Sequence, residues 1–291
     1  MGLDFSVAAS GAADTTISAS DGKKLVLADG LFRVPLEHWL KPASLPLRPL
    51  ANWPAVGAPL DLRLVSGPLP VLYGRPLTGQ DGRGFLDLGE REVHCGIDIL
   101  GSCFFMLTRY EEVAKPEQDI HGRYPVSAAL AFQEGFLRRP IVNEYLELLW
   151  ACLHHLWPQL QRKERQYRLI PTHDLDLPLS VAGKAWPHVL QRVAGDLLRR
   201  REVGLSYRRL AAKVKSYFGD FDSDPNNTFD FLLDLHEARG LQSRFFFLAG
   251  HTGGMSDGDY PLSLPWMRRL LRRLSERGSS IGLHCSYDTI A

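Results

Sequence analysis

The sequence predicts a mixed α/β protein of two domains: an N-terminal α+β domain, followed by a domain in which strands and helices alternate. At 291 residues, the chain is longer than one small hydrophobic core usually serves. The pattern changes near residue 165, in the charged segment QRKERQ, where we place the boundary between 1–165 and 166–291. After it, apolar runs of strand length alternate with amphipathic helices, which is typical of parallel strands joined by right-handed crossovers.

The first domain mixes short strands with helices. Residues 62–74 predict two short strands around a Gly-Pro turn. Residues 98–112 predict a buried helix with Asp98 as its N-cap, and residues 139–160 predict an amphipathic helix that begins at Pro140. The apolar stripe of this second helix consists of Ile141, Tyr145, Leu148, Leu149, Cys152, Leu153 and Leu156.

The second domain reads as a βαβαβ arrangement with one long insertion. We expect strands over 167–176, 243–250 and 279–288, and helices over 228–240 and 262–278, with Thr228 as an N-cap and Gly240 and Gly278 as stops. Residues 179–227 form the insertion, which carries nine Lys/Arg against two Asp/Glu between 181 and 215. We interpret it as a solvated helical excursion; the alternative is a patch for an anionic glycan, a nucleotide-sugar or a membrane surface.

The composition excludes several classes of protein. Hydrophobic residues make up 45% and charged residues 23%, as in ordinary soluble globular proteins, and a net charge of +1 gives no reason to expect nucleic-acid binding. Cys95, Cys103, Cys152 and Cys285 lack metal-knuckle spacing and suit reduced thiols. Residues 1–18 lack the features of a signal peptide, and no apolar stretch is long enough to span a membrane. We therefore expect a cytoplasmic protein.

Polar residues follow each predicted strand of the second domain. They form three clusters, Thr172-His173-Asp174-Leu175-Asp176, Gly250-His251-Thr252 and His284-Cys285-Ser286-Tyr287-Asp288. Parallel α/β sheets bind ligands at these strand ends, and Asp174 and Asp176 share a side because they are two residues apart. One imidazole with two or three carboxylates suits Zn²⁺ or another divalent first-row metal; the alternative is a set of ordinary satisfied polar residues.

The segments LIPTHDLD, SRFFFLAG and ERGSSIGLHCSYD resemble the first half of a metal-dependent polysaccharide deacetylase of carbohydrate esterase family 4. The family's two motifs, TFDDG and HSxxH, stand at the ends of barrel strands. The resemblance implies that Asp174 is the catalytic base and that Asp176 and His284 are metal ligands. Asp288 stands in the place of the second motif's other histidine, a departure that makes the ligand set harder and more anionic.

The same resemblance implies the reaction and its partners. It implies hydrolytic removal of acetyl groups from a carbohydrate, with zinc as the metal and Mn²⁺, Ni²⁺ or Co²⁺ as competitors. His173 stands where the first motif has a phenylalanine, and is either a partner that orients Asp174 or a buried structural histidine. His251 has no counterpart among the family's ligands.

The first domain resembles an uncharacterised domain that precedes deacetylase-like domains in a group of bacterial proteins. The resemblance covers roughly residues 30–165 and depends on CGIDILGSCFFMLTRYEE, DIHGRYP and FLRRPIVNEYLELLW. It assigns no chemistry. We interpret the polar run Arg109-Tyr110-Glu111-Glu112 as the surface of a helix C-terminus.

Three strands cannot close a barrel, and the resembled family has about seven. We therefore expect the chain, which ends at Ala291, to be a C-terminally truncated fragment with little catalysis of its own. Two other functions stay open. One is a non-catalytic module for glycan binding or polysaccharide assembly. It is favoured by Asp288, an aspartate where the resembled family has a histidine. The other is a different metal hydrolase on a barrel, against which the absence of a His-x-His motif counts.

Overall fold

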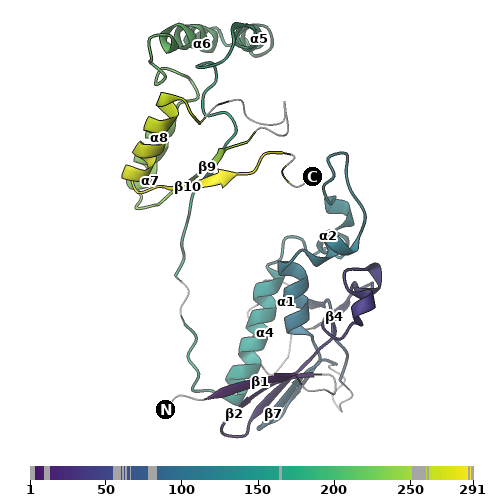
Figure 1. Cartoon of the computed structure of the whole chain (residues 1–291). Coiled ribbons are helices and arrows are strands. Elements are labelled where there is room, and N and C mark those ends of the chain that lie inside the picture. Colours follow the sequence, from purple (N-terminus) through teal and green to yellow (C-terminus); the bar gives the residue numbers. More distant parts are fainter. Residues whose placement is uncertain are drawn as a thin grey trace. The chain divides into compact units, whose positions relative to one another are not determined.

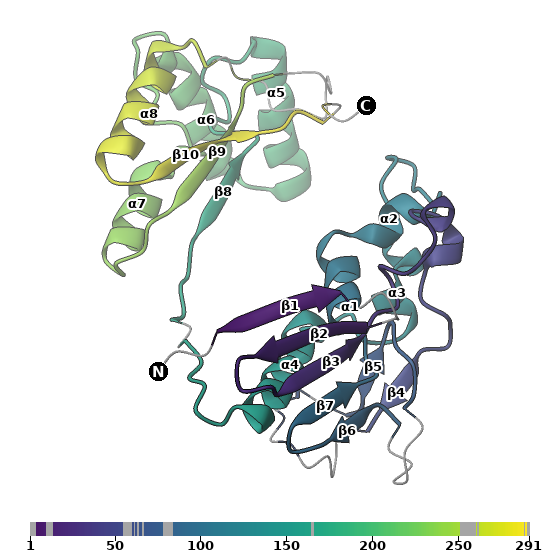
Figure 2. The same ribbon diagram turned by 60° about the horizontal axis from the view of Figure 1, so that its bottom comes forward.

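Figures 1 and 2 show the computed structural model of the chain. The structure describes residues 4–9, 14–54, 60, 62, 64–65, 67–77, 84–163, 166–250, 260, 262–287 and 289. The chain divides into two compact units, unit 1 (Met1–Lys163) and unit 2 (Glu164–Ala291), each of which is described by itself. The boundary expected after residue 165 lies next to this division.

Unit 1 combines a five-stranded sheet, a two-stranded sheet and several helices. Its strands are β1 (Phe5–Ala9), β2 (Asp14–Ala19), β3 (Lys24–Ala28), β4 (Ala51–Trp53), β5 (Leu69–Val71), β6 (Leu86–Leu88) and β7 (Glu92–Cys95). Its α-helices are α1 (Ile99–Leu107), α2 (Tyr110–Ala114), α3 (Leu130–Gln133) and α4 (Ile141–Leu156). Short 3₁₀ turns η1 (Leu36–His38), η2 (Pro42–Ser44) and η3 (Val126–Ala128) lie between them.

Helix α4 packs against the five-stranded sheet, whose order is β1-β2-β3-β7-β6. All neighbouring pairs are antiparallel except β3 and β7, which are parallel. Leu25, Val93 and Leu148 are fully buried in the shared core. The apolar stripe expected over 141–156 is confirmed, with five members buried and Leu149 and Leu153 partly buried. Of the two strands expected over 62–74, β5 is the second; residues 63 and 66 of the first lie outside the described residues.

The helix expected over 98–112 is broken in two. Asp98 is its N-cap, as predicted, and accepts hydrogen bonds from Gly101 N–H at 2.7 Å and from Gly30 and Leu31 N–H at 2.8 and 2.9 Å. Helix α1 ends at Leu107, because Arg109 adopts a left-handed conformation with φ of 56°. This reorients the chain so that Tyr110 and Glu111 of α2 are buried.

Unit 2 has the expected alternation, with a helical insertion after its first strand. Its elements are β8 (Thr172–Leu175), α5 (Trp186–Gly195), the π-helical turn η4 (Asp196–Arg200), α6 (Val203–Ser216), α7 (Phe229–Glu237), β9 (Arg244–Leu248), α8 (Pro265–Glu276) and β10 (Ser280–His284). Strand β8 is shorter than expected. Residues 166–170 before it are exposed, and they stand outside the sheet.

The three strands form a parallel sheet in the order β10-β9-β8, with α7 and α8 packed on one face (Figure 2). The register pairs His173 with Phe245 and Ile281, and these side chains share the face that the helices cover. Asp174, Phe246 and Gly282 are paired in the same way and share the opposite face. The ring of Phe246 crosses Gly282, where a Cβ atom would approach the ring to 2.5 Å.

The insertion leaves and rejoins the sheet at one anchored point. Asp224, almost fully buried, accepts hydrogen bonds from the N–H groups of Ser180, Val181 and Ala182 at 2.8 to 2.9 Å. Between these ends the chain forms the hairpin, as we name residues 186–218, in which α5 and α6 lie side by side (Figure 1). The helical content expected for this segment is therefore confirmed.

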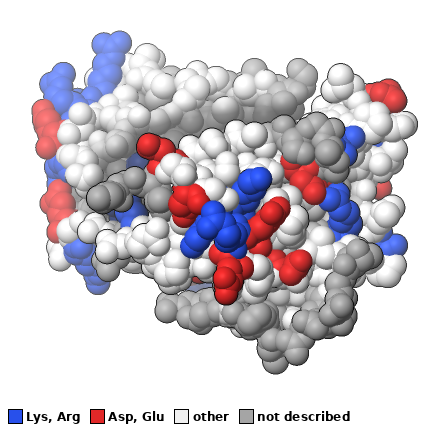
Figure 3. All heavy atoms as spheres, turned by 90° about the horizontal axis from the view of Figure 1, so that it is seen from below, with Lys and Arg blue, Asp and Glu red and all other residues white. Residues whose placement is uncertain are grey.

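Surface charge is mixed on the face that Figure 3 shows, where Lys/Arg and Asp/Glu are interspersed. Within the described part of the chain, no helix has both the length and the apolar character that a membrane crossing requires. The cysteines are free thiols; Cys95 and Cys152 are buried and Cys285 is exposed.

Candidate functional site

The carboxyl ends of β8 and β10 bring two of the predicted metal ligands together. Asp176 follows β8 directly and His284 ends β10, on opposite sides of the central strand β9. Asp176 Oδ1 lies 3.7 Å from His284 Nε2. Because parallel strands end at one edge of a sheet, residues more than 100 positions apart in the sequence can meet here.

A hydrogen bond to a backbone carbonyl selects one tautomer of the neutral His284 ring. Its Nδ1 lies 2.8 Å from the carbonyl oxygen of Cys285. A carbonyl only accepts, so Nδ1 carries the proton, and Nε2 of the neutral ring turns a lone pair towards Asp176. Two acceptors facing each other repel unless a proton or a cation lies between them. Metal-binding histidines characteristically donate their other N–H to a carbonyl or carboxylate in this way.

Asp176 and His284 are spaced so that both could bind one zinc ion. Two ligands about 2.0–2.2 Å from one zinc ion can be 3.7 Å apart. Asp288 and His251 lie outside the described residues. Among those the structure describes, no three His, Cys, Asp or Glu side chains are close enough to hold a metal. The described part therefore supplies two donors of the expected three.

Asp174, the predicted base, lies on the same face of the sheet as His284. The parallel register pairs Asp174 with Phe246 and pairs His284 with Leu248, two residues further along β9. The carboxylate is exposed and has no hydrogen-bond or ion-pair partner within the described part of the chain. It lines an open groove of about 500 Å³ beside β8, whose other wall includes Thr228 and Leu232 at the start of α7.

Tyr260 connects the strand ends, a role that the sequence did not suggest. Its hydroxyl donates to Leu175 O at 2.6 Å and accepts from Leu248 N–H at 2.8 Å, so it joins β8 to β9. Burial raises the pKa of this hydroxyl above its usual value, the Leu248 hydrogen bond offsets part of the rise, and the charge of Asp176 adds to it. The only sequence signal is a lone tyrosine in GDYPL, which no motif distinguishes.

His173 faces away from this edge, into the helix-covered side of the sheet. Its ring stacks on Phe245 at 4.7 Å and on His236 of α7 at 5.2 Å between centroids. Its Nε2 is buried without a hydrogen-bond partner among the described residues. Burial, and then repulsion by His236, lowers the pKa of His173. Of the two roles considered for it, this packing favours the structural one.

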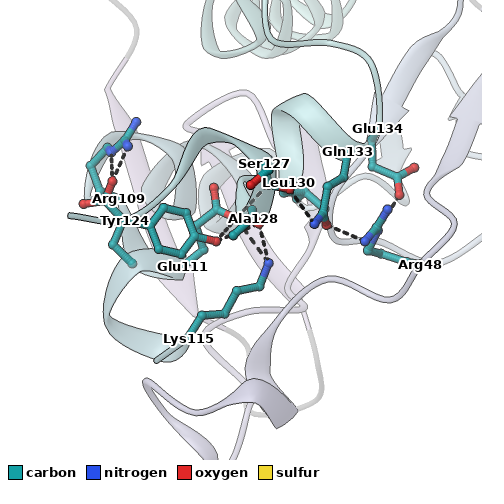
Figure 4. A network of polar contacts seen from close by, with 11 residues as sticks. Arg48, Arg109, Glu111, Lys115, Tyr124, Ser127, Ala128, Leu130, Gln133 and Glu134 are labelled. Carbon is teal, nitrogen blue, oxygen red and sulfur yellow. Dashed lines mark hydrogen bonds and ion pairs between the residues drawn. The ribbon is translucent and has the colours of Figure 1, made fainter. Parts of the chain in front are cut away.

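In unit 1, the residues of the run Arg109-Tyr110-Glu111-Glu112 make polar contacts, and Figure 4 shows those of Arg109 and Glu111. Arg109 and Glu112 pair with each other at the surface. Glu111 is buried and accepts from Leu130 N–H at 2.8 Å, while Tyr110 accepts from Leu40 N–H at 2.7 Å. These contacts hold two loops onto α2, so the expectation of a surface run is wrong for Tyr110 and Glu111.

Comparison with known proteins concerns unit 1. Residues 50–158 match the model of a family described as a family of unknown function (DUF7033). The matched segment contains α1 to α4 and, apart from Arg48, the labelled residues of Figure 4, but it reaches neither Asp174 nor His284. The comparisons with curated proteins and with solved structures find no match.

Proposed function

We propose that unit 2 carries the metal-binding edge of a (β/α)-barrel hydrolase that removes acetyl groups from a carbohydrate. The observation that supports this most is the approach of Asp176 Oδ1 to His284 Nε2, with the Cys285 carbonyl holding the imidazole in the ligand tautomer. Asp174 lies on the same face with its carboxylate free for proton transfer. We place this activity in the cytoplasm, on a glycan or a glycan precursor.

Each residue has a distinct task in this proposal. Asp176 and His284, with Asp288, would hold a divalent ion, zinc or else Mn²⁺, Ni²⁺ or Co²⁺. Such an ion polarises an acetyl carbonyl and acidifies water. Asp174 accepts the proton that the attacking water loses, the water oxygen bonds to the acetyl carbon, and the bond from that carbon to the sugar's nitrogen or oxygen breaks. The sugar atom takes up a proton, which Asp174 returns to it, and the acetyl group leaves as acetate. The groove beside β8 receives the sugar next to Asp174.

A second candidate function is a glycan-binding or polysaccharide-assembly module without turnover. It is favoured by Asp288, which stands where the resembled family has the second histidine of its HSxxH motif. This module would use the same groove and would not need Asp174 as a base.

The two are separated by zinc titration of this chain and by acetate release from the full-length protein, because three strands cannot close a barrel. We expect Asp176→Ala and His284→Ala to weaken zinc binding by at least about 100-fold. Asp174→Asn is expected to keep zinc affinity and lose acetate release from acetylated oligosaccharides. Glu37→Ala, which removes an exposed carboxylate in unit 1, serves as the matched control.

Unchanged zinc affinity in Asp176→Ala would contradict the ligand assignment. Glycan binding without acetate release at any metal loading would favour the second candidate.

A further inference from the structure

Helix α6 turns three of its large apolar side chains towards solvent. Val203, Tyr207 and Val214 recur on one helical stripe, and Phe218 continues it just beyond the helix end. Their exposed fractions are 69%, 73%, 49% and 86%. We name these four residues the outer stripe. A surface helix of a globular protein usually buries such a stripe, so α6 has the reverse orientation.

The opposite side of α6 buries polar and charged groups. Arg209 Nε lies 2.7 Å from Asp196 Oδ2, and both side chains are less than a tenth exposed. Lys213 Nζ lies 5.8 Å from the ring centre of Trp186 and 4.8 Å from that of Tyr217, and it donates to Lys184 O at 2.6 Å. The apolar core of the hairpin is small and consists of Val181, Val189, Val193 and Ala212, with Leu210 beside them.

The rest of the hairpin extends the exposed apolar surface and adds positive charge at its tip. Leu190, Leu197 and Leu198 are exposed on α5 and η4. Arg199-Arg200-Arg201 follow at the tip, where Arg201 makes the turn with φ of 59°. Trp186 and Tyr217 meet around Lys213, so the exposed side chains of α5 and α6 are connected. Of the exposed cations, Arg199 and Arg208 have no ion-pair partner in the described part of the chain.

We propose that the hairpin binds the surface of an anionic lipid membrane. Exposed Leu, Val, Phe, Tyr and Trp side chains interleaved with Arg and Lys are what an interfacial helix needs: the apolar groups enter the acyl boundary and the cations meet the headgroups. The aliphatic members favour lipid over a soluble anionic glycan, because a glycan stacks on aromatic faces and gains little from exposed Leu and Val. This inference is independent of the metal site.

The test is sedimentation of the full chain with vesicles of phosphatidylglycerol and phosphatidylcholine, compared with phosphatidylcholine alone. We expect binding to the anionic vesicles only, and its loss at about 0.5 M salt. Tyr207→Ser with Phe218→Ser should lower the partition coefficient about tenfold. Arg199→Gln with Arg208→Gln should lower it by roughly the same factor at low salt. Circular dichroism and thermal unfolding confirm that each variant is folded.

Matched controls test whether the hairpin itself is responsible. Leu36→Ser with Ile120→Ser removes equally exposed apolar groups from unit 1, and Arg269→Gln with Arg272→Gln removes two exposed cations from α8. Both pairs should leave vesicle binding unchanged. Absence of vesicle binding at low salt, or an equal loss in the controls, would overturn the proposal. Binding to a soluble polyanion, lost in the hairpin variants and without vesicle binding, would assign the surface to a glycan instead.

Discussion

Helices α6 and α8 are both basic and amphipathic, yet they face opposite ways. Helix α8 buries Trp266, Met267, Leu270 and Leu274 in the core that contains Phe245 and Phe247 of β9. Its Arg273, and Arg277 just beyond its end, pair at the surface with carboxylates of α7. Helix α6 instead buries Arg209 and Lys213 and exposes the outer stripe.

The difference shows that amphipathicity alone does not decide which side of a helix is buried. Helix α8 follows a strand of the sheet and meets an apolar face already formed by β9. Helix α6 belongs to an insertion that packs mainly on its own partner helix, where Asp196 offers a buried carboxylate. Burying Arg209 and Lys213 costs desolvation, which the ion pair, the carbonyl of Lys184 and two aromatic rings offset.

The largest expected effect comes from the carboxylate that holds α6 in this orientation. Asp196→Ala leaves the buried Arg209 guanidinium without its partner and should lower the free energy of unfolding by about 3 kcal/mol. Asp230→Ala removes an exposed partner of Arg273 and should cost less than about 1 kcal/mol. Urea unfolding followed by circular dichroism measures both. The double variant Asp196→Ala with Arg209→Met should recover most of the loss; equal effects at Asp196 and Asp230 would remove the distinction between the two helices.

A smaller difference in stability is expected between apolar substitutions on the two helices. Leu274 of α8 is fully buried, so Leu274→Ala should destabilise the protein by about 2–3 kcal/mol. Val214→Ala in the outer stripe should change stability by no more than about 0.5 kcal/mol, because that side chain is already half exposed. The same urea titration measures both. A large loss in Val214→Ala would mean that the outer stripe packs against another part of the chain.

Much of the fold follows from local patterns in the sequence. The alternation of strands and helices after residue 228, the N-cap at Asp98 and the stripe of α4 were predicted, because each depends on periodicity or on a single capping hydrogen bond. The approach of Asp176 to His284 was expected from their places at parallel strand ends. These features can be predicted from a few neighbouring residues and from the rule that parallel strands end at the same edge of a sheet.

Other features depend on contacts between distant segments. The break at Arg109 lets Tyr110 and Glu111 accept hydrogen bonds from Leu40 and Leu130. These partners lie outside the helix that the local pattern predicts. The outward face of α6 follows from the pairing of Asp196 with Arg209, which no helical period reveals. Tyr260 joins β8 to β9 through Leu175 O and Leu248 N–H. Both groups belong to strands that precede Tyr260 in the sequence, so no local pattern predicts the contact.

The smallest expected effect concerns the buried cations of α6 and the partly buried imidazole of His173 in β8, whose Nε2 is buried. Arg209 has a carboxylate partner, whereas His173 has only rings around it, and its pKa is lowered by burial and then by His236. The unfolded chain therefore binds more protons than the folded one once the pH falls below the usual imidazole pKa of about 6.5. This contribution to stability is complete above that value and is lost as the pH falls through it.

His173→Phe should therefore flatten the decline in stability between about pH 6.5 and pH 5. At pH 7.5 its unfolding free energy should stay within about 1 kcal/mol of the unmodified protein, since Phe fills a similar volume against Phe245 and leaves no unsatisfied nitrogen. His188→Gln on the exposed side of α5 should leave the decline unchanged. Urea titrations at several pH values measure all three proteins. If His173→Phe shows the same decline in stability as the unmodified protein, the folded state accommodates the charged His173 ring. His173 and Arg209 would then differ in their contacts but not in whether the fold tolerates their charge.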